Sequence, residues 1–240
     1  VSQLAEDGVS GSGAAITGKE GFFRLFGNFE WTEADTEAMS RTLEEVNPLV
    51  SPCLTIKLWP SCSSNHQATF AFLDILKEHP EITPESIAKI DVYLNRKALT
   101  ELVTPNPKTG VEARFSPAFH FALALNKIAL SPDNFCTEVV MRPDVRKVID
   151  MTTLHHDPQW DDHYPWPATV VVTTKDGQTF KQFRIHPDGG GAIPLQEEQL
   201  REKFENCTLN LLGKDRCDEL YKKLSTLETI PSIRDITSLL

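Results

Sequence analysis

The sequence is short of basic residues: it has 24 lysines and arginines against 34 aspartates and glutamates, for a formal net charge of −10. Because contacts to nucleic-acid phosphates need clustered lysine and arginine, this balance argues against a nucleic-acid partner. It does not exclude an anionic small molecule, since a few local cations can outweigh a distant net charge. The sequence also lacks an apolar run long enough to span a bilayer, and it lacks a signal peptide. We therefore expect neither a nucleic-acid nor a membrane partner.

Cysteine residues are few, and their spacing matches no known framework. They are odd in number, and no two of them form a CxxC pair. This pattern favours neither a disulfide framework nor a zinc site, and it indicates a reducing compartment. We expect a cytoplasmic protein, and a mitochondrial one stays open if a transit peptide lies upstream of Val1. The cysteines are Cys53, Cys62, Cys136, Cys207 and Cys217.

Two stretches look like functional motifs but lack a defining feature. Gly189-Gly190-Gly191 has no GK[ST] ending, so we predict a hinge and not a phosphate loop. The stretches His155–Asp157 and Asp161–His163 contain residue types that bind metals. Adjacent histidines on a strand point to opposite faces, however, and the prolines nearby are typical of a loop. We therefore favour a solvated loop and expect no metal site.

The composition is that of an ordinary soluble globular protein, with 40% hydrophobic and 24% charged residues. At 240 residues the chain can form one large domain or two small ones. Residues 1–48 predict short, closely packed helices. Thr32 is the expected N-cap of one of them, which we expect to end at Asn47-Pro48.

The middle of the chain mixes strand and helix patterns, whereas its end is helical again. We therefore predict an α+β fold class: an all-helical domain is interrupted by an inserted α+β lid domain with a mainly antiparallel sheet and helices on one face. The expected domains are residues 1–50, 51–188 and 189–240, the first and last belonging to the helical domain. Strands are predicted at 54–59, 90–94, 151–154, 170–174 and 179–185, with a hairpin turn at Asp176-Gly177, and helices at 68–76, 116–125, 143–149, 195–204, 214–224 and 233–240.

The first candidate site follows the predicted strand 54–59, in the sequence from Lys57 through Pro60 and Cys62 to His66. Lys57 would neutralise a substrate carboxylate, although a solvent-facing lysine on an alternating strand is the plainer interpretation. Cys62 would serve as an acid or nucleophile only if its ionisation is controlled, and most isolated cysteines are small buried groups. His66, at the start of the next helix, has either a titrating or a structural role.

The second candidate site opens the helix at 116–125. Arg114 and Ser116 precede Pro117, with Lys108 and Thr109 just upstream. Free amides at a helix start beside a guanidinium would form a pocket for a carboxylate. The alternative is plain capping by the serine next to a surface arginine.

Taken in order, these motifs resemble the MmgE/PrpD family, over nearly the whole chain and over the C-terminal half of a typical member. The match runs from the glycines before Phe22 through Lys57–His66 and Ala113–Ser116 to later motifs in family order. Those later motifs are Pro143–Arg146, Asp176-Gly177, Pro194-Leu195 and Lys203-Phe204. We therefore expect the chain to be part of a longer protein.

The resemblance implies roles for individual residues. Lys57 would face the substrate carboxylates, and Cys62 would be a second catalytic residue. Arg114, Ser116 and His66 would bind substrate, with Arg114 replacing the more usual lysine. Cys62 stands where decarboxylase-type members tend to have histidine, which argues against cis-aconitate decarboxylation. The family's other catalytic residues, histidines included, would lie in the missing N-terminal half, so a complete site needs that half as a partner.

The expected function is that of a lyase acting on a small anionic di- or tricarboxylate. Dehydration of 2-methylcitrate is the first expectation: a base removes the proton next to a carboxylate while an acid assists loss of hydroxide. Cis-aconitate decarboxylation and epimerisation stay open within the family, as does a non-catalytic fragment or binding module. The resemblance implies no metal or organic cofactor, and it implies a homodimer.

Overall fold

The computed structural model describes residues 2–27, 31–45, 54–190 and 192–240. The chain divides into two compact units, Val1–Leu54 and Thr55–Leu240. The expected boundary at residues 50 and 51 and the expected helix end at Asn47-Pro48 both lie outside the described residues. The assignment of lid and helical domains stays a prediction.

The first unit contains the short helices α1 (Ser2–Glu6) and α2 (Phe22–Gly27) and the longer α3 (Glu33–Glu45). Thr32 caps α3 as expected, because the amide of Asp35 donates to its Oγ1 atom at 3.3 Å. The Asp35 carboxylate accepts in return from the backbone amide of Thr32 at 2.8 Å. This reciprocal pairing satisfies amides that a helix start would otherwise leave without partners.

The second unit is built around a four-stranded sheet in the order β2-β1-β3-β4. The β3–β4 hairpin turns at Asp176-Gly177 as predicted, and Gly177 has φ +87°. β1 pairs antiparallel with β3, but it pairs parallel with β2. The expectation of a mainly antiparallel sheet is therefore right only in part. The chain between β1 and β2 contains several helices and is long enough for the crossover that a parallel pair needs. The strands are β1 (Ile87–Leu94), β2 (Thr152–His156), β3 (Ala168–Thr174) and β4 (Thr179–Arg184).

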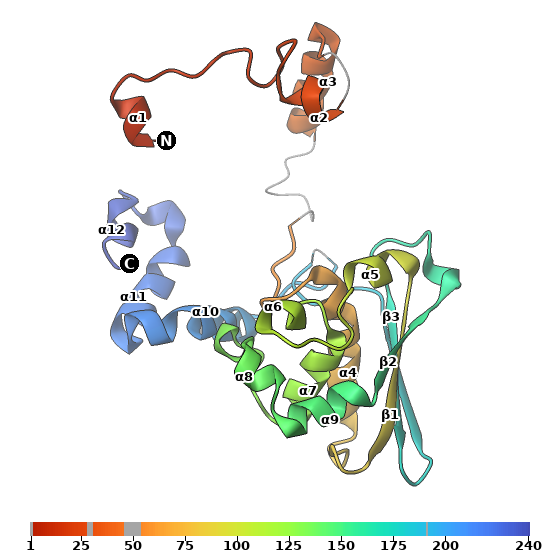
Figure 1. Cartoon of the computed structure of the whole chain (residues 1–240). Helices are drawn as coiled ribbons and strands as arrows, with labels where there is room; N and C mark the ends of the chain where they lie inside the picture. The colour runs from red at the N-terminus through yellow and green to blue at the C-terminus, as the bar shows by residue number, and fades with distance from the viewer. Residues whose placement is uncertain (1, 28–30, 46–53, 191) are drawn as a thin grey trace. The chain divides into compact units, whose positions relative to one another are not determined.

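Helices cover one face of this sheet, and the core lies between the two layers (Figure 1). On β1, the alternate residues Ile90, Val92 and Leu94 are buried and belong to this core. In the helical layer Phe72 stacks on Phe121 with ring centroids 4.3 Å apart. The covering helices are α4 (His66–Glu78), α7 (Pro117–Leu125) and α9 (Pro143–Asp150), close to the ranges that the sequence predicts.

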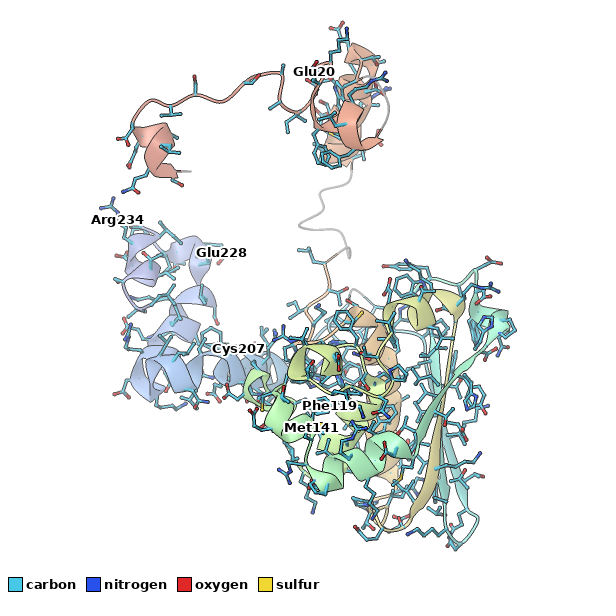
Figure 2. The ribbon with its side chains drawn as sticks, in the orientation of Figure 1. Glu20, Phe119, Met141, Cys207, Glu228 and Arg234 are labelled. Atoms are coloured by element: carbon cyan, nitrogen blue, oxygen red, sulfur yellow. The ribbon has the colours of Figure 1, made fainter. Side chains whose placement is uncertain are left out.

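Shorter helices connect these elements, and a helical segment follows the sheet. Phe119 of α7 is fully buried inside the helical layer, whereas Met141, just after α8, is half exposed at its edge (Figure 2). Of the predicted last helix at 233–240, only four residues are helical. The remaining elements are α5 (Arg96–Glu101), α6 (Gly110–Ala113), α8 (Thr137–Val140), α10 (Glu197–Leu212), α11 (Lys214–Leu224), α12 (Arg234–Thr237) and the 3-10 turns η1 (Ser63–Asn65), η2 (Pro132–Asn134), η3 (Pro158–Trp160) and η4 (Leu227–Thr229).

The predicted strand at 54–59 is wrong, since these residues form no regular element. A strand needs a ladder of backbone hydrogen bonds to a neighbour, and among the described residues this segment makes one, from the Ile56 amide to the Gly189 carbonyl at 2.8 Å. Leu54 and Ile56 are also exposed, at 61% and 44%. Residues 55–59 are therefore an irregular segment that leads to Pro60, exposed at its start and half-buried at Leu58 and Trp59.

No helix within the described ranges is long and apolar enough to cross a membrane.

Candidate functional site

The two candidate motifs lie side by side in the second unit. The Arg114 backbone carbonyl accepts a hydrogen bond from the Cys62 amide at 2.9 Å and another from Asn65 Nδ2 at 2.8 Å. Asn65 is fully buried, so this carbonyl fixes the turn at the start of α4 to the end of α6. The predicted residues Lys57, Cys62, His66 and Arg114 thus come from one contiguous region.

Lys57 lies on the irregular segment before this turn. Its Nζ atom donates to the backbone carbonyl of Ser61 at 3.0 Å, so the side chain follows the turn that precedes η1. Gly189 supports the segment from the other side, with φ +94° and an ideal Cβ position only 2.1 Å from the Ile56 carbonyl oxygen. The close approach therefore requires glycine at this position.

His66 opens α4 and is 2% exposed. Its Nε2 atom lies 3.5 Å from Ser61 Oγ. Burial, with the positive charges of Lys57 and Lys203 as smaller causes, lowers the pKa of His66 to about 4. Both charges therefore act at a single buried imidazole, which is neutral at physiological pH. The titrating role that the sequence left open would require a pH far below neutral.

Trp59 separates this histidine from a pocket of about 310 Å³. Its ring centroid lies 5.1 Å from that of His66 and 4.7 Å from that of Phe70. Lys203, on α10, lines the same pocket together with polar neighbours on that helix. Sequence reasoning noted Lys203 only as part of a family motif, since nothing local places α10 beside α4. The other lining residues are Leu58, Leu73, Ala129, Leu130, Gln199, Glu202 and Asn206.

His120, on α7, is a second buried histidine that sequence reasoning missed. Burial, with the nearby His66 as a smaller cause, lowers the pKa of His120 to about 3. The Thr69 hydroxyl donates to the Asn65 carbonyl at 2.8 Å, so His120 Nδ1 at 2.9 Å acts as the donor to Thr69 Oγ1. Nε2 of His120 is buried and has no partner among the described residues. His120 is far from His66 in the sequence, so no local pattern could predict that the two histidines lie near each other.

Cys62 is partly buried, and its Sγ atom donates toward Glu101 Oε2 at 3.8 Å. The same carboxylate oxygen accepts from Ser64 Oγ at 2.6 Å. Glu101, the last residue of α5, was not among the predicted site residues. A glutamate at the end of a short helix has no local signature, so only the fold brings it to the thiol.

Of the two residues of the second motif, Arg114 is exposed and Ser116 is buried. The Arg114 side chain is exposed, and its guanidinium has no hydrogen-bond or carboxylate partner in the part of the chain that the structure describes. Ser116 is buried, accepts from the Phe119 amide at 3.4 Å and donates to the Pro105 carbonyl at 3.3 Å. These contacts fit the capping alternative for Ser116, and its contact with a substrate stays a prediction.

His155 and His156 are adjacent on β2, so their side chains point to opposite faces of the strand. His155 Nε2 lies 2.8 Å from Asp91 Oδ1, whereas His156 Nε2 lies 2.9 Å from Asp161 Oδ1. The two side chains thus pair with different carboxylates. Across residues 2–27, 31–45, 54–190 and 192–240, no group of three or more His, Cys, Asp or Glu side chains is arranged to hold a metal ion.

Comparison with known proteins agrees with this arrangement of motifs. The MmgE/PrpD C-terminal domain matches residues 59–227. Cis-aconitate decarboxylase of Mus musculus is 29% identical over 152 residues, which is 62% of this chain and 29% of that protein. The Homo sapiens protein of the same name gives the same identity and coverage. A cis-aconitate decarboxylase-like protein, oryM, from Aspergillus oryzae is 23% identical over 135 residues, 56% of this chain and 28% of that protein.

The chain therefore spans less than a third of the length of these curated relatives. The family match, by contrast, covers well over half of the chain and includes Trp59, Cys62, His66 and Arg114. On that match, the chain belongs to the MmgE/PrpD family.

Proposed function

We propose that this chain forms part of a lyase that acts on a small di- or tricarboxylate. One observation supports the proposal above the others: the neutral, buried His66 lies within the electrostatic influence of two lysines, Lys57 and Lys203. Neither lysine forms an ion pair with a carboxylate in the described part of the chain. Two uncompensated cations beside a pocket are suited to an anionic ligand that supplies the missing charges.

The pocket has the right size for such a ligand. Its volume of about 310 Å³ is that of a small-molecule site. Trp59 and Phe70 provide an apolar wall, Lys203 supplies a positive charge, and Glu202 supplies a negative charge. Exclusion of water by this wall would strengthen the attraction between a carboxylate and the lysines.

The proposed roles of the site residues follow from the negative charge that develops on the substrate in the transition state. Removal of a proton next to a carboxylate places negative charge on that carboxylate in the transition state. Lys57, with the exposed Arg114 nearby, would stabilise this charge. His66 is a poor proton acceptor in this setting, because burial and both lysines oppose the imidazolium form. We therefore assign it a neutral hydrogen-bonding role.

Dehydration of a 2-methylcitrate-like substrate is the first candidate reaction, in which loss of hydroxide follows proton removal. Decarboxylation of cis-aconitate is the second, and the names of the curated relatives favour it. The cysteine at position 62, where decarboxylase-type members tend to have histidine, favours the first. Both reactions would use the same pocket and the two lysines beside it.

The remaining site residues would come from the rest of the parent protein, because the relatives are more than three times as long as the aligned part of this chain. We propose that this N-terminal half completes the site and that the whole assembles as a homodimer in the cytoplasm.

The test is a product assay on the protein with 2-methylcitrate and with cis-aconitate, followed by proton nuclear magnetic resonance. Formation of an unsaturated tricarboxylate from 2-methylcitrate supports dehydration, and formation of an unsaturated dicarboxylate with release of CO₂ from cis-aconitate supports decarboxylation. Saturable binding without product would favour the binding module instead. Absence of both binding and product in the complete parent protein would overturn the lyase proposal.

A further inference from the structure

One face of α10 forms the polar side of the pocket of about 310 Å³. The residues of α10 that line the pocket are Gln199, Glu202, Lys203 and Asn206. Successive residues of an α-helix are rotated by about 100°, so all of these side chains start within one sector about 100° wide. Glu202 lies at one border of the sector and Lys203 at the other, with the two amides between them. The pocket therefore presents a negative and a positive charge at separate places.

The Glu202 carboxylate is not neutralised by the chain itself. It forms no ion pair and no hydrogen bond with the other residues that the structure describes. Arg201, the preceding residue of α10, pairs with Glu205 and Asp218 instead. Lys203 is adjacent but forms no ion pair with Glu202, because neighbouring residues on a helix do not face each other. Both charges in the pocket are thus open to a ligand.

The two amides of this face differ in their contacts. Gln199 Nε2 donates to Asp188 Oδ2 at 3.2 Å, and Gln199 Oε1 accepts from the Gln196 amide at 2.9 Å. Asn206 is exposed, and its side-chain amide has no hydrogen-bond partner within the described ranges. Glu202, Lys203 and Asn206 are therefore the polar groups of α10 that can contact a ligand.

The two charges accept different groups of a ligand. An ionised carboxylate only accepts hydrogen bonds, whereas an ammonium group only donates them. A carboxylate of the ligand is therefore attracted to Lys203 and repelled by Glu202. A hydroxyl group of the ligand can instead donate to Glu202, and hydrogen bonds to a charged acceptor are stronger than neutral ones. A pocket with both charges thus suits a molecule that carries a hydroxyl as well as a carboxylate.

We propose that Glu202 is a specificity-determining residue of this pocket, which selects hydroxy acids over carboxylates that lack a hydroxyl. This inference rests on the proposed function, in which the pocket holds a small di- or tricarboxylate. It favours dehydration, whose substrate carries the hydroxyl that is lost, over decarboxylation of cis-aconitate, which carries none.

Citrate and tricarballylate are the probes, because they carry the same carboxylates and differ only in the hydroxyl. By calorimetric titration of the wild-type protein, we expect the Kd of citrate to be roughly three- to tenfold below that of tricarballylate. The ratio is modest because Glu202 is exposed. In Glu202→Ala the ratio should fall to about one, since citrate loses its acceptor and tricarballylate is freed from a repulsive charge.

Glu198→Ala is the matched control, because Glu198 is an exposed glutamate of the same helix that does not line the pocket. Its ratio should equal that of the wild-type protein. Both variants should keep the wild-type circular dichroism, since alanine is the strongest helix former. Equal affinity of the wild-type protein for the two ligands would overturn this inference alone, as would an unchanged ratio in Glu202→Ala. Absence of binding of either ligand would overturn the proposed function, and this inference with it.

Discussion

Asn65 and Arg114 are joined by a hydrogen bond from a buried side-chain amide to a backbone carbonyl, at 2.8 Å. This one contact connects the turn that follows Lys57 to the segment that precedes α7. The two candidate motifs therefore meet through a contact to the main chain, which leaves the exposed Arg114 side chain out of the junction.

Asn65→Ala should loosen this junction. The Arg114 carbonyl would keep one donor, the Cys62 amide, and lose the other. We expect the free energy of unfolding to fall by about 1–3 kcal/mol, the usual cost of breaking a buried hydrogen bond. Urea denaturation measures it, and Asn210→Ala, at an exposed asparagine of α10, should cost less. Equal effects of the two substitutions would contradict the role of Asn65.

Gly189→Ala should be more harmful than the same change at a comparable glycine. Gly189 has φ +94° and no room for a methyl group, because Cβ would lie 2.1 Å from the Ile56 carbonyl oxygen. Gly177 has φ +87° but nothing within 4 Å of its Cβ position. Both changes cost about 1–2 kcal/mol in backbone strain. Only Gly189→Ala adds a clash that displaces the segment before Lys57.

Thermal unfolding of the two glycine variants distinguishes the backbone strain, which both share, from the steric clash, which only Gly189→Ala has. A clearly lower Tm for Gly189→Ala than for Gly177→Ala is the expected result. Similar Tm values for both variants would show that the contact between Ile56 and residue 189 is not tight in solution.

Stability should fall as the pH drops below about 6.5. In the folded chain burial holds the pKa of His66 near 4 and that of His120 near 3, below the ordinary histidine value of 6.5. The unfolded chain binds these protons first, so the stability is fully present above pH 6.5 and is lost as the pH falls toward 4 for His66 and toward 3 for His120. The total effect is on the order of several kcal/mol.

Urea titrations at pH 8, 6.5 and 5 check this dependence in a window where most carboxylates are still charged. Replacing His66 with asparagine should flatten the curve between pH 6.5 and 5. A wild-type curve that is already flat there would contradict the buried, neutral state of the two histidines.

Local signals in the sequence predicted much of the fold. Ser116 before Pro117 and Thr32 before Glu33 mark helix starts through hydrogen bonds within a few residues, and Asp176-Gly177 marks a turn by its own backbone preference. The parallel β1–β2 pair and the irregular segment at 54–59 depend on which neighbours the fold supplies. An apolar alternating run cannot reveal whether a partner strand exists.

The candidate site also combines residues that a local motif predicts with residues that only the fold brings together. Lys57 and His66 were found because they share one short motif. Lys203, Glu101 and His120 come from α10, α5 and α7, and each has an ordinary local sequence. Only the fold brings them close to His66 or Cys62.

Lys57→Gln and Lys203→Gln should each weaken the binding of a small carboxylate. Loss of one charged contact raises the Kd by roughly 10- to 100-fold, because hydrogen bonds to charged groups contribute about 1.5–3 kcal/mol. Lys77→Gln, at an exposed lysine near the end of α4, removes the same charge away from the pocket. It is the matched control and should leave the Kd nearly unchanged.

Calorimetric titration of the wild-type protein and these three variants with 2-methylcitrate and cis-aconitate tests the central claim most directly. The account predicts saturable binding that both Lys57→Gln and Lys203→Gln weaken at least tenfold, while Lys77→Gln has little effect. Equal affinity in all four proteins would contradict the assignment of Lys57 and Lys203 as the cations that bind the substrate.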